Sequence, residues 1–254
     1  MEIVFLGTGG GRINLIKQIR GTGGFRIDSS SANIHVDPGP GALISSLMEK
    51  EDPLSLDAIV VTHNHVDHFS DAMVMIEGMT NYGLKNRGII IGSKAAMEGQ
   101  DRAIHAYHQS KVEAAYIAVP GEKKTFKTEK GSFDIEIIAM NHEEKTAFGF
   151  KLFLDGKVIG HITDTEPAEH LGKAFSGCDV LIVNCMKPVV DKYHGHLTTG
   201  DVIEVVKEAR PKTCVITHMG LKMLRDGPAK AAETIEKESG VKTVAAKDGM
   251  RFKV

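Results

Sequence analysis

The feature that most limits how this chain can fold is a short segment in which four potential metal ligands follow an apolar, strand-like run at 57–62. Alternate side chains at the end of a strand share one face, so His63 and His65 can converge on a single point. Asp67 and His68 come after the chain has turned, and they can address a neighbouring point. Because zinc accepts imidazole nitrogens and carboxylates as ligands, the segment predicts a metal site at the edge of a sheet. The segment reads Thr62-His63-Asn64-His65-Val66-Asp67-His68.

Strand-like and helix-like patterns alternate along all 254 residues, and no low-complexity linker separates them. A single domain over 1–254 is therefore expected. Two sheets with helices on both outer faces would bury every apolar face, although periodicity alone fits a two-layer or a four-layer α/β protein. Apolar, β-branched runs predict strands at 2–6, 33–36, 57–62, 88–92, 133–139, 147–154, 157–162, 179–184, 213–217 and 242–246. Helical spacing of apolar residues predicts helices at 40–50, 71–82, 93–110, 167–176, 199–209 and 228–239.

The composition excludes several classes of function. Lys and Arg number 31 against 33 Asp and Glu, and the net charge of −2 is not that of a protein that coats nucleic acid or anionic membranes. No apolar run approaches the ~20 residues that a membrane-spanning helix needs, and the N-terminus does not resemble a signal peptide. The cysteines are odd in number and outside any CxxC spacing, as in reduced intracellular proteins. We therefore expect a soluble, cytoplasmic protein without a membrane partner. Its cysteines, expected as buried apolar side chains, are Cys178, Cys185 and Cys214.

Taken in order along the chain, the metal-ligand segment and four shorter motifs resemble the metallo-β-lactamase superfamily. The resemblance covers nearly the whole chain. It implies an α/β fold of the αββα type, a four-layer sandwich in which two mixed β-sheets are flanked by helices. It also implies a dinuclear metal site along the edge between the two sheets. The four motifs are Val36-Asp37-Pro38-Gly39, Asn141-His142, Ile162-Thr163-Asp164-Thr165 and Thr217-His218.

The same resemblance assigns the ligands of two divalent metal ions. Asp164 would bridge the ions, and Asp37 would support a ligand histidine from behind. Zinc fits this donor set best, but manganese, iron and nickel also bind His and Asp, and the sequence does not choose among them. For the first ion the implied ligands are His63, His65, His142 and Asp164. For the second ion they are Asp67, His68, Asp164 and His218.

Two further motifs resemble the branch of the superfamily that contains RNase Z and cyclic phosphodiesterases. In Gly195-His196-Leu197-Thr198, the resemblance implies that His196 acts as a general acid in phosphodiester cleavage. RNase Z typically has serine where this chain has Leu197. His194 is an alternative, since either ring of the pair can face the site. The opening segment 5–12 lacks the spacing of a nucleotide-binding loop, so we interpret its glycines as a turn whose backbone passes close to the active site.

This chain differs from RNase Z in the stretch between His68 and His142. It contains predicted helices and strands but no long glycine- and proline-rich arm of the kind with which RNase Z grips tRNA. The missing arm and the weakly acidic charge favour a small phosphodiester over RNA. Near the opening glycines, Arg20 and Arg26 are candidates for holding a substrate phosphate, with solvated loop positions as the commoner alternative. We expect His105 and His108 on a solvated helix face, and Met73, Met75, Ile76, Met79 and Tyr82 in the core.

The expected chemistry is hydrolysis by a hydroxide that bridges the two ions. Asp67 would orient the hydroxide as well as bind metal, and His196 would protonate the leaving alkoxide. Three alternatives stay open: a tRNA 3′-processing endonuclease without the long arm, a carboxylic ester or lactone hydrolase, and a metal-holding interaction protein without activity. The sequence does not tell which small phosphodiester or ester is the substrate, or whether the chain forms a homodimer.

Overall fold

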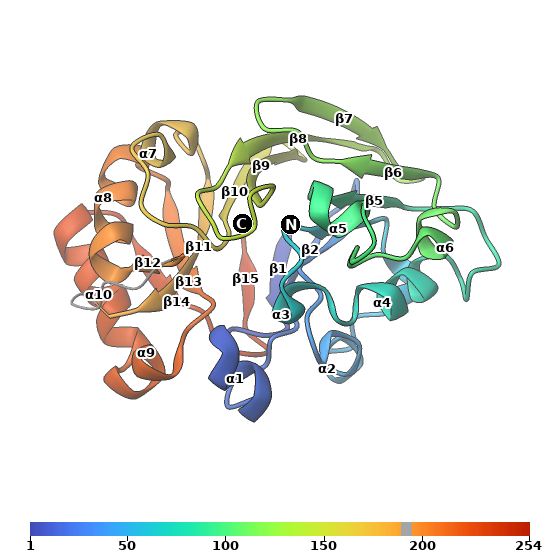
Figure 1. Ribbon diagram of the computed structural model, residues 1–254. Coiled ribbons are helices and arrows are strands. Elements are labelled where there is room, and N and C mark those ends of the chain that lie inside the picture. Colours follow the sequence, from blue (N-terminus) through green and yellow to red (C-terminus); the bar gives the residue numbers. More distant parts are fainter. Residues whose placement is uncertain (189–194) are drawn as a thin grey trace.

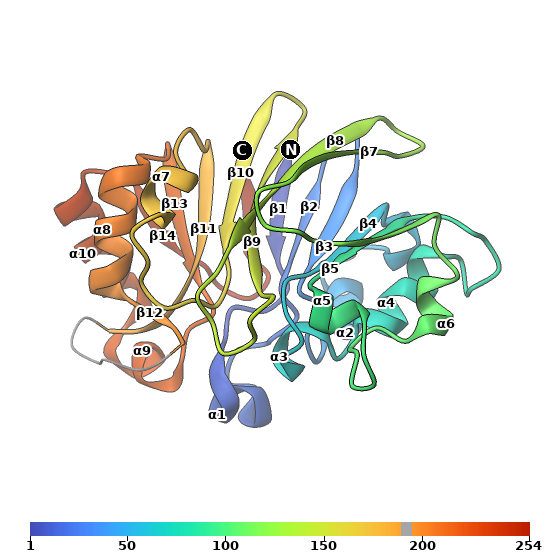
Figure 2. The same cartoon turned by 45° about the horizontal axis from the view of Figure 1, so that its top comes forward.

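The computed structural model describes residues 1–188 and 195–254, which form two facing β-sheets with helices on both outer sides (Figures 1 and 2). The strands of the first sheet are, in spatial order, β15 (Arg251–Lys253), β1 (Glu2–Phe5), β2 (Phe25–Asp28), β3 (Asn33–Val36), β4 (Ala58–Val61), β5 (Ile89–Gly92) and β6 (Ala114–Ile117). Pairing is antiparallel from β15 through β3 and parallel from β3 to β6. The first sheet is therefore mixed.

The second sheet is also mixed. Its strands are, in spatial order, β14 (Thr243–Ala245), β13 (Thr213–Thr217), β11 (Val180–Lys187), β10 (Lys157–Ile162), β9 (Phe148–Leu154), β8 (Ser132–Ala139) and β7 (Lys123–Lys127). Pairing is parallel from β14 to β10 and antiparallel from β10 to β7. The short β12 (Leu197–Thr198) adds to β11 beside this path.

Helices complete the two outer layers. One set lies on the side of the first sheet and the other on the side of the second sheet (Figure 1). The helices are α1 (Gly11–Lys17), α2 (Ala42–Met48), α3 (Val66–Phe69), α4 (Ala72–Met79), α5 (Lys94–Met97), α6 (Ala106–Gln109), α7 (Leu171–Ala174), α8 (Thr199–Ala209), α9 (Leu221–Asp226) and α10 (Pro228–Ser239), with a 3-10 turn, η1, at Pro53–Ser55.

Three apolar layers hold the sandwich together. Between the sheets, Phe148 and Phe150 of β9 lie among apolar residues of the first sheet. Outside the first sheet, Met75 of α4 packs against the residues of β4. Outside the second sheet, Val206 of α8 and Ile235 of α10 cover the parallel strands. Each fully buried side chain of this size contributes about 1.5–3 kcal/mol relative to exposure. The predicted αββα arrangement is confirmed.

The predicted strands lie within three residues of the observed ones, but the single helix predicted at 93–110 is wrong. That stretch forms two short helices, α5 and α6, because Gly99 takes a φ of 88° and the chain leaves the helical conformation there. Tyr82 is two-thirds exposed, which corrects its assignment to the core, whereas Met75 and Met79 are buried as expected. Strands β2, β6, β7, β12 and β15 had no counterpart among the predicted strands.

The loops that follow β4, β10 and β13 gather at one edge of the sandwich. Helices α1, α3 and α9 lie at this edge, with α1 in contact with both of the others (Figure 1). Strand ends from both sheets thus deliver residues to one place. Among the helices of residues 1–188 and 195–254, none has the length and apolar character needed to cross a membrane.

Candidate metal centre

The histidine-rich segment changes structure in its middle, and this change divides its side chains between two positions. Strand β4 is buried throughout and ends at Val61, so His63 and His65 extend from its end. His65 precedes the single helical turn of α3, where its carbonyl oxygen accepts a hydrogen bond of 2.9 Å from the N–H of His68. Asp67 and His68 therefore project from a helical turn rather than from the strand.

The first group of candidate ligands combines the strand-end histidines with residues from the second sheet. Nitrogen and oxygen atoms of its members all lie within 4.8 Å of one another. His142 Nε2 lies 3.3 Å from His65 Nδ1, and His63 Nε2 lies 3.9 Å from Asp164 Oδ2. Asp164 follows the end of β10, as the sequence pattern predicts. The members are His63, His65, His142 and Asp164.

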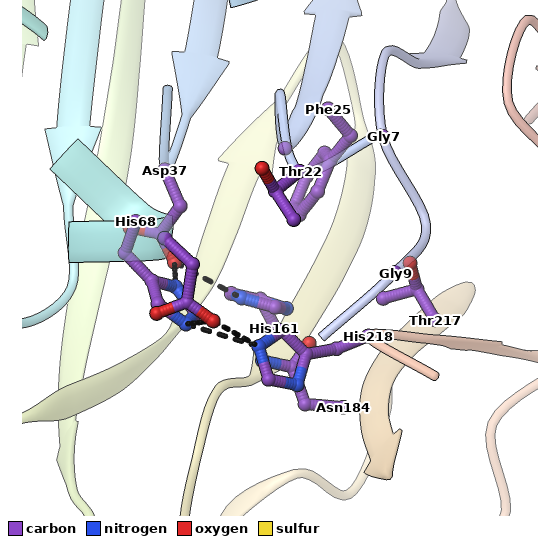
Figure 3. Close-up of a pocket in the computed structure, with 12 residues that line it drawn as sticks. Gly7, Gly9, Thr22, Phe25, Asp37, His68, His161, Asn184, Thr217 and His218 are labelled. Atoms are coloured by element: carbon purple, nitrogen blue, oxygen red, sulfur yellow. Dashed lines mark hydrogen bonds and ion pairs between the residues drawn. The ribbon is translucent and has the colours of Figure 1, made fainter. Parts of the chain in front are cut away.

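The second group lies beside the first and has its own convergent atoms. It consists of Asp67, His68 and His218. His218 Nε2 lies 3.2 Å from His68 Nε2 and 3.4 Å from Asp67 Oδ2, and Figure 3 shows the His68 and His218 rings turned toward each other. Asp164 also reaches this group, with Oδ2 3.4 Å from His68 Nε2 and Oδ1 3.3 Å from His218 Nδ1. Asp164 thus stands between the two groups.

These spacings fit resident metal ions. Two nitrogen or oxygen ligands of one tetrahedral zinc ion stand about 3.3 Å apart, because each lies about 2.0–2.1 Å from the ion. Among the described residues, the buried His63 Nε2, His196 Nδ1 and His218 Nδ1 have no hydrogen-bond partner. A buried polar atom without a partner costs about 1–3 kcal/mol, which coordination to an ion would remove. The donor set and its unpartnered nitrogens therefore suit divalent cations.

The electrostatics of the site point the same way. Burial alone would lower the pKa of His68, yet Asp37, Asp164 and Asp67 together raise it well above its ordinary value. Burial acts to raise the pKa of Asp164, but the surrounding histidines hold it well below its usual range. The pKa of Asp67 is lowered as well, so two carboxylates that favour the ionised form face one small volume, and such an arrangement calls for cationic charge. Burial also lowers the pKa of His63, which keeps its ring neutral and able to coordinate.

A side-chain carboxylate and a backbone carbonyl orient two of the candidate ligands from behind. Asp37 accepts bonds of 2.7 Å from both the N–H and the hydroxyl of Thr62, and His68 Nδ1 donates to it at 2.9 Å. The expected supporting role of Asp37 is therefore consistent with its contacts. His142 Nδ1 donates to the Gly195 carbonyl at 3.0 Å. These bonds leave Nε2 of each histidine facing the centre.

Asn184 is a residue of the site that the sequence did not reveal. Its amide donates a hydrogen bond of 2.8 Å to Oδ1 of Asp164. It is the polar side chain in the otherwise apolar run 180–186 of β11, and that interruption was the available signal. Cys185 beside it is buried with its sulfur 4.0 Å from Thr199 Oγ1, so the neighbouring cysteine faces the helices.

His196 lies next to both groups and reaches solvent. Its side chain is 16% exposed, and Nδ1 lies 3.5 Å from Asp164 Oδ2. With Asp164 and His218 it forms a third cluster of potential ligand atoms. Burial acts to lower its pKa, but Asp164 raises the pKa above the ordinary value. His194, the alternative to His196, lies outside the described residues.

The opening glycines approach the site as expected. Gly7 and Gly9 line a small cavity behind His68 and His218 (Figure 3). A Cβ at Gly10 would stand only 2.2 Å from His218 Nδ1, so that position accepts no side chain unless the loop moves. The backbone therefore passes directly over one of the candidate ligands.

The two arginines considered for phosphate binding have other partners. Arg26 is buried in β2, where it pairs with Asp28 at 2.6 Å, and its proposed contact with substrate is wrong. β2 was not predicted because its charged residues interrupt the apolar pattern by which strands were recognised. Arg20 donates to the Thr8 hydroxyl at 3.0 Å. His105 is exposed, as expected, and His108 is partly buried in an ion pair with Glu77.

Comparison with known proteins adds to this geometry. The family model described as a β-lactamase superfamily domain matches residues 32–219. The uncharacterized protein MJ1374 of Methanocaldococcus jannaschii is 33% identical over 259 residues, which span 100% of this chain and 95% of that protein. Ribonuclease Z of Metallosphaera sedula is 22% identical over 260 residues, which span 86% of this chain and 88% of the enzyme. The metallo-β-lactamase fold protein YhfI from Bacillus subtilis superposes with a TM-score of 0.79 at 18% identity, over 99% of this chain and 98% of YhfI.

Proposed function

Because this chain belongs to the metallo-β-lactamase superfamily, near its RNase Z branch, we propose that it is a dinuclear metal-dependent hydrolase of a small or cyclic phosphodiester. The observation that carries the proposal is the pair of convergent ligand groups joined by Asp164, with His196 beside them at the solvent side. A structural zinc site closes its coordination with four ligands, whereas this arrangement gathers more donors than one ion requires. The non-enzymatic reading is therefore less well supported.

The residues divide the binding of two divalent ions between them. The first group would hold one ion, the second group the other, and Asp164 would contact both. Zinc suits the mixture of imidazole and carboxylate donors, and manganese, iron and nickel are the alternatives. When bound, such ions supply Lewis acidity and an activated water.

The remaining chemistry belongs to Asp67 and His196. Asp67 is 13% exposed, so its carboxylate reaches from the second group toward the opening and is placed to accept a hydrogen bond from the attacking water. His196 is placed to donate a proton to the leaving alkoxide. Asp164 raises the pKa of His196, and a raised pKa favours the protonated form that a general acid requires.

Basic residues in segments that meet near the second group support an anionic substrate over a neutral lactone. Gly220 donates its N–H to the Met186 carbonyl at 3.0 Å, and a Cβ at Gly11 would stand 3.2 Å from the Met186 sulfur. Three chain segments therefore meet near Met186, and each carries a basic residue within two positions of these contacts in the sequence. These residues are Arg12, Lys187 and Lys222. Positive charge in such segments would favour a phosphate as substrate.

The stretch after α3 argues against a tRNA-gripping arm. Residues 72–139 build α4 to α6 and β5 to β8, and they are incorporated in the layers of the sandwich. No part of this described stretch forms a separate projection of the kind that RNase Z uses. A small substrate is therefore favoured over structured RNA.

An activity panel tests the proposal. Metal-stripped protein is reconstituted with zinc or manganese and assayed on bis(p-nitrophenyl) phosphate, 2′,3′-cyclic nucleotides, structured RNA and lactones. We expect turnover of the phosphodiesters to exceed that of the lactones and the RNA. An Asp164→Asn protein assayed in parallel identifies activity from a contaminant. Turnover of lactones alone, with every metal, would refute the phosphodiesterase assignment.

A further inference from the structure

Asp248 lies at the surface in the turn between β14 and β15, yet both its carboxylate oxygens accept hydrogen bonds from the N-terminal part of the chain. Oδ1 accepts from the N–H and the hydroxyl of Thr8, at 2.9 and 2.6 Å. Oδ2 accepts from the N–H of Gly21 at 2.7 Å. Ionised acceptors make stronger hydrogen bonds than neutral ones. The carboxylate therefore anchors the buried Thr8, which stands 240 positions earlier in the sequence.

Thr8 begins a stretch that holds Met219, the residue directly after His218. The Thr8 carbonyl accepts a bond of 2.8 Å from the Met219 N–H, and the Gly10 N–H donates to the Met219 carbonyl at 3.0 Å. Gly10 also lies against the His218 ring, because a Cβ added at Gly10 would stand only 2.2 Å from Nδ1. Figure 3 shows Gly9 of the same stretch close to the strand end that carries His218.

The backbone of His218 needs this support. Its φ of 56° is in the left-handed region, which a residue other than glycine adopts only where the surroundings hold it. The stretch 8–10 supplies contacts on both sides of the residue that follows His218, and a backbone surface against its ring. The place of the imidazole therefore depends on where this stretch lies.

We infer that Asp248 is a positioning residue for His218, which it controls by anchoring Thr8. The inference rests on the proposed function, because it matters only where the second group binds an ion. The hydrogen bonds of Asp248 that the structure describes go to Thr8 and Gly21, so its effect on the metal centre is indirect. The effect should fall on the second ion, since the histidines of the first group come from other segments.

Asp155 provides a matched control. It lies in the turn between β9 and β10, where Oδ2 accepts from the N–H of Ser30 at 3.0 Å and from its hydroxyl at 2.7 Å, while Oδ1 accepts from Ser31. It therefore anchors a loop with the same number of bonds as Asp248. Its turn precedes β10, whereas Asp164 follows that strand, and five strand steps of about 3.3 Å separate the two ends by roughly 17 Å.

The experiment compares Asp248→Asn with Asp155→Asn. Asparagine keeps the shape of the side chain but has only one acceptor oxygen. It therefore cannot accept hydrogen bonds at both of the positions that the two carboxylate oxygens occupy. Metal-stripped proteins are titrated with Co²⁺ against a competing chelator, and the visible absorption gives an affinity for each ion. We expect Asp248→Asn to lower the affinity for the second ion by about 10–100-fold and to leave the affinity for the first ion unchanged. Asp155→Asn should leave both affinities unchanged, although both variants lose thermal stability.

A second pair of variants covers the case in which Asp248→Asn does not fold. Thr8→Val removes the hydroxyl that bonds to Asp248 but keeps the N–H, and Thr8→Ser keeps both. The second ion should bind more weakly to Thr8→Val and normally to Thr8→Ser. Equal affinities in these two variants, or equal weakening of both ions in Asp248→Asn, overturn the inference. A wild-type protein that binds fewer than two ions instead overturns the proposed function, and the inference with it.

Discussion

The side-chain amide of Asn184 donates a hydrogen bond of 2.8 Å to Oδ1 of Asp164, the carboxylate that stands between the two ligand groups. The other oxygen, Oδ2, lies 3.4 Å from His68 Nε2 and 3.9 Å from His63 Nε2. Asn184 and Cys185 are consecutive on β11, so their side chains point to opposite faces of the sheet. The amide therefore fixes the rotation of the carboxylate from within the core.

Replacing Asn184 by alanine removes this bond, and we expect the affinity for metal to fall by about 10–100-fold, the range for the loss of a partner that orients a ligand. Cys185→Ala is the matched control, because it removes a buried side chain of the same strand that faces the helices. The control should lower stability without changing metal affinity. Both are measured by chelator competition. Equal affinities in the two variants would contradict the role of Asn184.

Asp164→Asn should cost the protein both ions, because the neutral amide cannot serve as an anionic ligand of two cations at once. Asp67→Asn should cost only the second ion, since Asp67 belongs to the second group alone. Elemental analysis after reconstitution and desalting gives the metal content of each variant. Loss of a single equivalent from Asp164→Asn would show that its carboxylate does not bridge.

The candidate ligands were predictable because their pattern is local. Alternation at a strand end and a following turn place His63, His65, Asp67 and His68 whatever the rest of the chain does. The meeting of Asp164 and the remaining histidines at the edge of the sandwich was harder to predict. Only the resemblance to the superfamily indicated that these distant residues lie in one place.

Contacts between segments that lie far apart in the sequence could not be predicted from it. Asn184 is the one polar residue in the apolar run 180–186, and a hydrogen-bonded core residue gives the same pattern. Asp248 anchors Thr8 across 240 positions, and no periodicity reports such a pairing. Arg26 was expected at a substrate phosphate or in a solvated loop, but it is buried. Its burial in β2 depends on partners contributed by neighbouring loops, among them the Asp52 carbonyl at 2.9 Å.

His35 should make the stability of the protein depend on pH independently of the metal centre. It is fully buried on β3, its Nε2 donates to the Gly23 carbonyl at 2.8 Å, and burial lowers its pKa to about 4. Between the unfolded value of 6.5 and the folded value near 4, only the unfolded chain binds the proton. The free energy of unfolding should therefore fall with decreasing pH, by about 1.4 kcal/mol per pH unit from this residue.

The variant His35→Gln keeps a donor for Gly23 but does not titrate. Urea unfolding of the metal-free wild type and variant between pH 4.5 and 6.5 gives the two slopes. We expect the free energy of unfolding of the variant to depend less steeply on pH than that of the wild type. The difference should be about 1.4 kcal/mol per pH unit, which corresponds to one proton bound on unfolding. Parallel slopes would mean that His35 does not control this dependence.

His196 should act on turnover and not on metal binding. It lies 3.5 Å from Asp164 and is partly exposed, which places it where a leaving group departs. We expect His196→Ala to keep its metal content and to lose a factor of about 10²–10⁴ in turnover on a substrate with an alkoxide leaving group, as for other positioned proton donors. His105→Ala, which removes an exposed histidine on the far segment before α6, should turn over both kinds of substrate like the wild type.

The leaving group separates a general acid from the other roles that His196 can have. p-Nitrophenolate departs without protonation, so the loss in His196→Ala should shrink strongly on bis(p-nitrophenyl) phosphate. A histidine that only orders the site would slow both substrates alike and lower the thermal stability, and a histidine that coordinates an ion would lose metal. The paired measurement of turnover on the two substrates and of metal content therefore distinguishes the three. An equal loss on both substrates at full metal occupancy contradicts proton donation by His196.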